Sequence, residues 1–197
     1  YHGSKDCSPI CGATSATYSI AAVTSADAGS YTVTVSGACG SPVTSSAAAL
    51  VVNTPVAITT QPSGATLCEG APASFTVVAT GSGLTYQWSK DGNPIGGATS
   101  ATYAIAAVTS ADAGSYAVTV SGTCGSPVTS AAAALVVNTP VAITTQPANA
   151  SACSGGSVTF TVEATGTSLT YQWSKDGTPF AGATASSITI GPVTAAD

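Results

Sequence analysis

Tyr86-Gln87-Trp88-Ser89-Lys90-Asp91-Gly92 decides the fold, and the same seven residues return unchanged at positions 171–177. In a strand, successive side chains point to opposite faces, so Tyr86, Trp88 and Lys90 share one face. Asp91-Gly92 supplies the positive-φ residue that a tight hairpin turn needs. We therefore predict a strand over residues 84–90 that ends in a hairpin.

Self-comparison of the whole sequence gives a period of 85 residues. Near-identical copies suit a spacer or polymer, in which every unit does the same mechanical job, better than an enzyme with one active site. Residues 13–62 reappear as residues 98–147 with differences only at Ser19/Ala104, Thr32/Ala117, Ala38/Thr123 and Ser46/Ala131.

Within one repeat, short alternating segments are separated by Gly, Pro and Asp, and no helical periodicity competes with them. Phe75 and Val77, for example, lie in phase on one face of a predicted strand. About seven short strands with frequent turns in fewer than ~100 residues are typical of a sandwich of two packed sheets. We predict an all-β chain of tandem sandwiches, with strands in each complete repeat at 56–61, 73–80, 84–90, 101–108, 115–121 and 129–138.

The repeat resembles the bacterial immunoglobulin-like repeats of large surface and secreted proteins, and the resemblance covers the whole chain. It implies tandem immunoglobulin-like domains of about seven strands each. The segments that carry it are Tyr86-Gln87-Trp88, Lys90-Asp91-Gly92, Gly97-Ala98-Thr99-Ser100, Asp112-Ala113-Gly114-Ser115-Tyr116 and Leu135-Val136-Val137-Asn138.

The resemblance also implies structural roles for single residues. Trp88 fills the centre between the sheets, and Tyr116 forms a tyrosine corner by bonding upstream backbone. Asp112 caps the turn before that strand rather than binding a metal. Val118 stands where antibody domains have their second cysteine, so the usual inter-sheet disulfide is absent. The further core and turn residues expected from the repeat are Trp173, Tyr31, Asp27, Gly29 and Gly114.

We expect three domains: a partial one at 1–53, with strands C to G, a complete one at 56–138, and a partial one at 141–197, with strands A to E. Gly3 replaces the tryptophan in the first, which argues against a normal core there. The sequence is either a window on a longer array or a subunit whose F and G strands complete the next chain's A to E strands. The linkers Asn53-Thr54-Pro55 and Asn138-Thr139-Pro140 are short and contain proline, which predicts a stiff rod.

Cys68 and Cys124 are the one cysteine pair inside the complete repeat, and we expect a disulfide between them. In the chain-entropy model such a bond stabilises the domain by roughly 4 kcal/mol. It implies an oxidising, extracytoplasmic setting. Cys39 is the repeat counterpart of Cys124, and Cys153 of Cys68, so we expect their partners in a neighbouring repeat or chain.

Cys7 and Cys11 enclose three residues, and we expect a local disulfide that clamps this loop. Redox chemistry is the rival interpretation, but it calls for two intervening residues and a helix N-terminus. A zinc site is disfavoured because no Cys-x-x-Cys or second histidine accompanies the cysteines.

Only 6% of the residues are charged, the net charge is −5, and three residues are basic. This excludes a patch that could neutralise nucleic acid or an anionic membrane surface, and no apolar run is long enough to span a bilayer. Domain surfaces usually carry ~25–35% charged residues, so we expect a covered surface, by self-association into a fibre or by glycans. Asn149 lies in a glycosylation sequon.

The repeat offers few residues for catalysis. His2 is the single histidine and has no recurrent carboxylate or serine companion, while the acids Glu69, Asp91 and Asp112 lie in separate loops. We predict no enzymatic activity, no cofactor and no metal.

The leading functional prediction is a structural repeat of an extracellular or cell-surface fibre, stalk or appendage. The alternative is an adhesin or module that binds a glycan or protein through its loops, around residues 93–97. The third is a non-catalytic appendage of a secreted enzyme.

Overall fold

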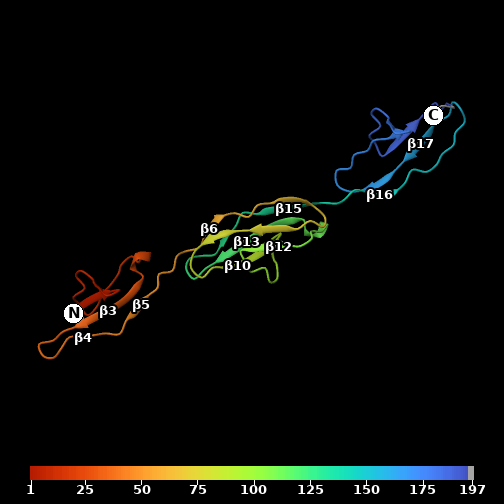
Figure 1. Cartoon of the computed structure of the whole chain (residues 1–197). Helices are drawn as coiled ribbons and strands as arrows, with labels where there is room; N and C mark the ends of the chain where they lie inside the picture. The colour runs from red at the N-terminus through yellow and green to blue at the C-terminus, as the bar shows by residue number, and fades with distance from the viewer. Residues whose placement is uncertain (195–197) are drawn as a thin grey trace.

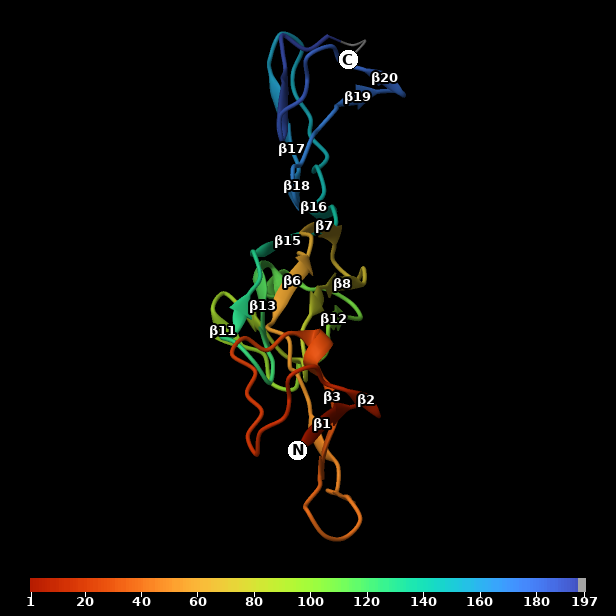
Figure 2. The same ribbon diagram turned by 90° about the vertical axis from the view of Figure 1, so that its left-hand side faces the viewer.

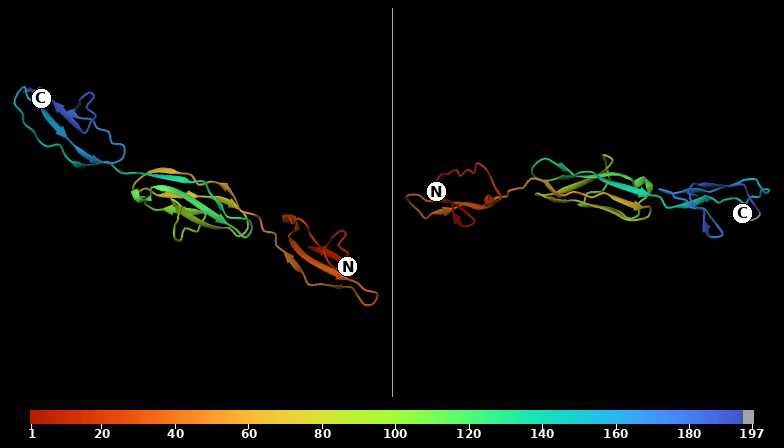
Figure 3. Two further views of the ribbon diagram at one scale, coloured as in Figure 1. Left: turned by 180° about the vertical axis from the view of Figure 1, so that it is seen from behind. Right: turned by 90° about the horizontal axis from the view of Figure 1, so that it is seen from above.

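The computed structural model describes residues 1–194 and shows three β-structured units in a row (Figure 1). The first unit holds β1 to β5, the middle unit β6 to β15, and the third unit β16 to β21. A single segment of chain joins each unit to the next, and the row is nearly straight in the right-hand view of Figure 3. Residues 195–197, at the end of the expected third domain, lie outside the described range.

The middle unit is a sandwich of two layers. One layer pairs β6 with β9 and β8 with β12, and β8 and β9 are consecutive parts of one strand that are separated by Val77. The other layer has the order β11-β10-β13-β15-β7, with β14 beside β13. The strands are β6 (Ala57–Thr60), β7 (Ala65–Cys68), β8 (Ala73–Thr76), β9 (Val78–Thr80), β10 (Thr85–Lys90), β11 (Asn93–Pro94), β12 (Thr102–Ile105), β13 (Gly114–Ser121), β14 (Val128–Thr129) and β15 (Ala133–Asn138).

Aromatic side chains from both layers meet in the core of the middle unit. Trp88 is 0% exposed, and Phe75 and Tyr116 are each 1% exposed. The ring of Phe75 stacks on that of Tyr116 with centroids 4.6 Å apart, and the ring of Tyr103 lies 6.3 Å from that of Trp88. Such pairs add to the hydrophobic contribution of the area they bury. The alternation predicted for residues 84–90 therefore places the tryptophan at the centre of the sandwich.

The all-β sandwich class is confirmed, and two strands and a short helix of the middle unit were missing from the prediction. These are β7, β11 and the 3-10 helix η2 (Ser110–Asp112). β7 runs parallel to β15, with Cys68 opposite Asn138. Figure 2 shows β7 at the end of the middle unit that faces β16 of the third unit. A four-residue segment next to glycines gives too little periodicity to be recognised as a strand.

The first unit contains one sheet, which corresponds to β10, β13 and β15 of the middle unit. Its order is β2-β1-β3-β4, and β5 also pairs with β3. A Cβ atom on Gly3 would lie 2.8 Å from the Cβ of Ala13, so a larger residue at this position would require Ala13 to shift. The elements are β1 (His2–Lys5), β2 (Ser8–Pro9), η1 (Ser25–Asp27), β3 (Gly29–Val35), β4 (Val43–Thr44) and β5 (Ala48–Leu50).

The third unit contains the opposite layer. β16 pairs with β18 and β17 with β21, as β6 pairs with β9 and β8 with β12, and a small hairpin joins β19 to β20. Two different halves of the same sandwich thus flank the complete one. The strands are β16 (Ala142–Thr145), β17 (Val158–Thr161), β18 (Glu163–Thr165), β19 (Ser174–Lys175), β20 (Thr178–Pro179) and β21 (Ser187–Ile190).

Candidate functional site

The tyrosine corner occurs in two copies. The hydroxyl of Tyr116 donates to the backbone oxygen of Asp112 at 2.8 Å, and that of Tyr31 donates to the backbone oxygen of Asp27 at 2.6 Å. Burial raises the pKa of Tyr116 to about 12, because a phenolate would lose its hydration in the core. These hydroxyls therefore remain hydrogen-bond donors at neutral pH and hold the turn before the strand.

Asp112 and Asp27 each cap the turn that precedes the tyrosine strand of their own unit. The carboxylate of Asp112 accepts the backbone N–H of Thr109 at 2.8 Å and its hydroxyl at 2.7 Å. The carboxylate of Asp27 accepts the same two groups of Thr24 at 2.7 Å. These bonds favour the charged form and lower the pKa of both aspartates. The oxygens are engaged in backbone capping, which is a structural role.

Lys90 and Asp91 also bond to the backbone of neighbouring segments and hold them in place. The ammonium of Lys90 donates to the backbone oxygen of Ala111 at 3.0 Å and lies 3.3 Å from a carboxylate oxygen of Asp91. Asp91 accepts the backbone N–H of Ser115 at 2.8 Å, which lowers its pKa together with the nearby Lys90. A side chain on Gly114 would collide with this carboxylate, since a Cβ there would lie 2.6 Å from it; Gly29 stands in the same relation to Asp6.

The described residues do not form a recognisable catalytic centre. In residues 1–194, no group of three or more His, Cys, Asp or Glu side chains could hold a metal ion. His2 lies exposed on β1, and Asn149 is exposed between β16 and β17. No helix within the described part of the chain is long and apolar enough to cross a membrane.

An open groove of about 500 Å³ lies along the first unit, lined by apolar side chains that include Ile10, Tyr18 and Leu50. It follows the sheet face that the other layer covers in the middle unit. A smaller groove of about 320 Å³ runs along the third unit beside Ile143 and Trp173. Both grooves are uncovered inner faces of half sandwiches rather than sites with converging polar groups.

Both interdomain linkers are tied to the unit that follows them by the same pair of hydrogen bonds. The backbone N–H of Thr54 donates to the hydroxyl of Ser82 at 2.9 Å, and the N–H of Ser82 donates back to the carbonyl of Thr54 at 3.1 Å. Thr139 and Thr167 repeat the pair at 2.8 and 3.2 Å. The sequence predicted stiffness from proline alone, and these reciprocal bonds supply a second physical reason for it.

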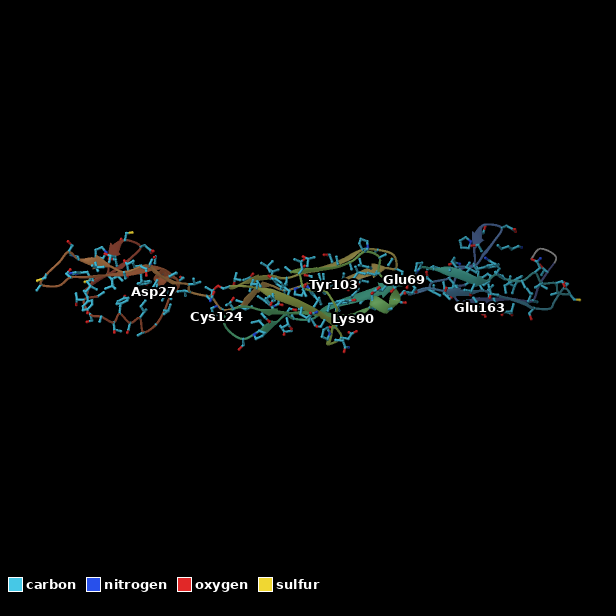
Figure 4. The ribbon with its side chains drawn as sticks, turned by 90° about the horizontal axis from the view of Figure 1, so that it is seen from below. Asp27, Glu69, Lys90, Tyr103, Cys124 and Glu163 are labelled. Carbon is cyan, nitrogen blue, oxygen red and sulfur yellow. The ribbon has the colours of Figure 1, made fainter. Side chains whose placement is uncertain are left out.

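The cysteines lie where the prediction did not place them. All six are free thiols in the structure. Cys68 lies opposite Asn138 at one end of the middle unit, whereas Cys124 follows the far end of β13. Figure 4 shows the two ends, with Cys124 next to the first unit and Glu69, which follows Cys68, next to the third.

The expected bond between Cys68 and Cys124 is therefore not formed in this fold. The eight residues of β13 separate the two ends, a length of about 25 Å at ~3.3 Å per residue. A disulfide requires Cα atoms within about 7 Å of each other. The local bond expected between Cys7 and Cys11 is not formed either, and both thiols are exposed on either side of β2.

Comparison with known proteins agrees with the architecture. No family model matches the chain. An I-band fragment of titin superposes with a TM-score of 0.77 over 100% of this chain and 78% of the fragment, at 20% identity. Immunoglobulin domains 1–5 of Sidekick-1 superpose with a TM-score of 0.51 over 90% of this chain and 43% of that one, at 22% identity. The fold is that of tandem immunoglobulin-like domains.

One curated protein is similar in sequence. A decoration protein of Escherichia phage T5 is 50% identical over 54 residues, which make up 26% of this chain. The match spans 33%, or about a third, of the phage protein's length. The shared segment is shorter than one 85-residue repeat.

Proposed function

We propose that this chain is a structural segment of an extracellular fibre, stalk or surface appendage, built from immunoglobulin-like units placed end to end. The observation that carries the proposal is the repeated junction, in which Thr54 bonds Ser82 and Thr139 bonds Thr167 in both directions. A spacer needs the same rigid connection at every step, whereas a single binding site needs only one special unit.

Three further features support a spacer. The copies are nearly identical, so each unit performs the same task. The charged groups of the middle unit are engaged in holding its loops. The surface carries few charges, which suits a chain whose sides are covered by neighbouring chains or glycans.

Small-angle X-ray scattering of the full chain tests the spacer function. We expect the maximum dimension of three units in line. Ser82→Ala with Thr167→Val removes two side-chain hydrogen bonds from each linker, each worth about 1 kcal/mol. We expect a smaller radius of gyration because the junctions bend. Ser126→Ala is the matched control, since Ser126 is exposed and its removal leaves the junctions intact. A wild-type chain that scatters as a compact or freely hinged particle would refute a rigid spacer.

A second candidate is a module that attaches to a surface or binds a glycan or protein. The similarity to a phage decoration protein favours it, because that protein's name describes a surface accessory. Negative-stain microscopy of the native material separates the two candidates. Long regular filaments support the fibre, while monomeric rods that bind glycans or a host protein support the attachment module.

A further inference from the structure

The two cysteines of the middle unit lie beside the two linkers, one at each end of the sandwich. We propose that, wherever two complete repeats follow one another, Cys68 of one repeat and Cys124 of the next form a disulfide across the linker between them. The inference rests on the proposed function, because it requires repeats placed end to end.

Cys68 is held at the exit of its repeat. Its partner across the parallel β7–β15 ladder is Asn138, the residue that begins the Asn-Thr-Pro linker. The backbone N–H of Glu69 donates to the carbonyl of Asn138 at 2.9 Å, and the N–H of Gly70 donates to the carbonyl of Val108 at 2.8 Å. The thiol of Cys68 is exposed at this end.

Cys124 is held at the entrance of its repeat. The backbone N–H of Thr123 donates at 2.8 Å to the carbonyl of Ser82, the same residue that bonds the linker at Thr54. Gly125, with a φ of +85°, brings the turn so close that a Cβ atom there would lie 3.3 Å from the Cβ of Pro55. The turn that carries Cys124 therefore rests directly on the preceding linker.

These two placements put a pair of thiols at one linker when complete repeats adjoin. Cys68 lies beside the asparagine of the Asn-Thr-Pro sequence, and the Cys124 of the following repeat lies beside the proline. The two linker residues are two positions apart, a span of about 7 Å in extended chain, so both cysteines lie at the same junction. The proposal requires the Cα atoms of the two cysteines to lie within about 7 Å of each other at this junction.

Cys39 and Cys153 hold the corresponding positions in the outer units. Gly40, which follows Cys39, has a φ of +89°, close to that of Gly125. Gly155 near Cys153 donates its N–H to the carbonyl of Val193, as Gly70 does to Val108. The first unit therefore offers a cysteine toward the preceding repeat, and the third unit offers one toward the following repeat. The middle unit offers one in each direction. The adjoining repeat can belong to the same polypeptide or to a second copy of the chain.

The reaction is an oxidation of two thiols. They lose two protons and two electrons as the sulfur–sulfur bond forms, and a small-molecule disulfide accepts the electrons and protons by thiol–disulfide exchange to become two thiols. Such disulfides persist outside the cytoplasm, where the proposed fibre would act. The product is a covalent cross-link between adjoining repeats at each junction, rather than a disulfide within each domain.

The test inserts a second copy of residues 56–140 after Pro140 of the full chain, so that two complete repeats adjoin. After treatment with oxidised glutathione, we expect non-reducing peptide mapping to find Cys68 of the first copy bonded to Cys124 of the second, with a mass lower by two hydrogens for the bond. Cys68→Ser in the first copy abolishes this peptide. Cys68→Ser in the second copy is the matched control and leaves it in place.

The unmodified chain provides the reference state, in which we expect glutathione adducts on Cys68 and Cys124 and no bond between them. Glutathione adducts on both cysteines at the duplicated junction, or a bond within one repeat, would overturn the inference. Small-angle scattering of the reduced, duplicated chain distinguishes a failure of the disulfide proposal from a failure of the proposed function. A straight rod without the bond refutes only the disulfide, whereas a collapsed particle refutes the spacer.

Discussion

Trp88 and Trp173 occupy the same position in two copies of the same seven-residue stretch, and both copies share the hydrogen bond of the indole. The indole N–H of Trp88 donates to the backbone of Ser100, and that of Trp173 to the backbone of Ala185, each at 2.9 Å. Their surroundings differ. Trp88 is fully buried between both layers, whereas Trp173 is only half-buried, because the third unit has no counterpart of β13 in the described residues.

The two tryptophans show which features depend on the local sequence and which depend on contacts with distant segments. The sequence of the stretch sets the turn and the hydrogen bond of the indole in both copies, whereas the strand has six residues in β10 and two in β19. Burial depends on a strand that arrives from much later in the chain, since Trp88 pairs with Val118 of β13. The hydrophobic contribution of the same side chain therefore differs greatly between the two units.

The largest expected effect is that of Trp88→Ala. Removing a large aromatic side chain from a packed core costs about 3–5 kcal/mol of unfolding free energy. We expect Trp173→Ala, the matched change at a half-buried site, to cost less, about 1 kcal/mol. Urea unfolding followed by far-ultraviolet circular dichroism measures both. Equal losses would show that the third unit buries its tryptophan in solution.

The next effect is that of Tyr116→Phe, which keeps the ring and removes the hydroxyl bond to Asp112. We expect a loss of about 1 kcal/mol in the middle unit. The corresponding Tyr31→Phe is the control, because Tyr31 is only half-buried in the first unit. The same urea titration reports the loss, and a larger loss for Tyr31→Phe would contradict the assignment of the core to the middle unit.

Tyr116 also predicts the response to alkali. Its pKa is raised to about 12 in the folded protein, so it binds its proton more tightly than in the unfolded chain, where tyrosine titrates near ~10. Its contribution is complete below pH ~10 and is lost as the pH rises through about 12. Thermal melts between these pH values should show a fall for the wild type that is smaller in Tyr116→Phe.

The smallest effect is expected for Asp112→Ala, which removes a half-buried cap. The pKa of Asp112 is lowered by its bonds to Thr109, so its contribution is present above pH ~4 and is lost as the pH falls through the lowered value. We expect a lower melting temperature at pH 7 than in the wild type, by less than in Tyr116→Phe, and a difference that shrinks on acidification. A difference that grows in acid would contradict the capping role.

Several parts of the site could be predicted because they depend on neighbouring residues. The turn at Asp91-Gly92, the cap formed by Asp112 and the tyrosine corner involve groups within a few positions of each other. The cysteines could not be placed in this way. Cys68 was expected near Cys124 because they belong to one repeat, but β7 pairs in parallel with β15 and carries Cys68 to the opposite end of the sandwich.

The sequence by itself determined the 85-residue repeat, the strand alternation around Trp88 and the turn residues, because these follow from residue spacing and backbone preference. The tertiary structure alone decided which tryptophan is buried, at which end each cysteine lies, and how Ser82 and Thr167 bind the linkers. Those features depend on contacts between segments far apart in the chain, and no local pattern of residues encodes the register in which such segments meet.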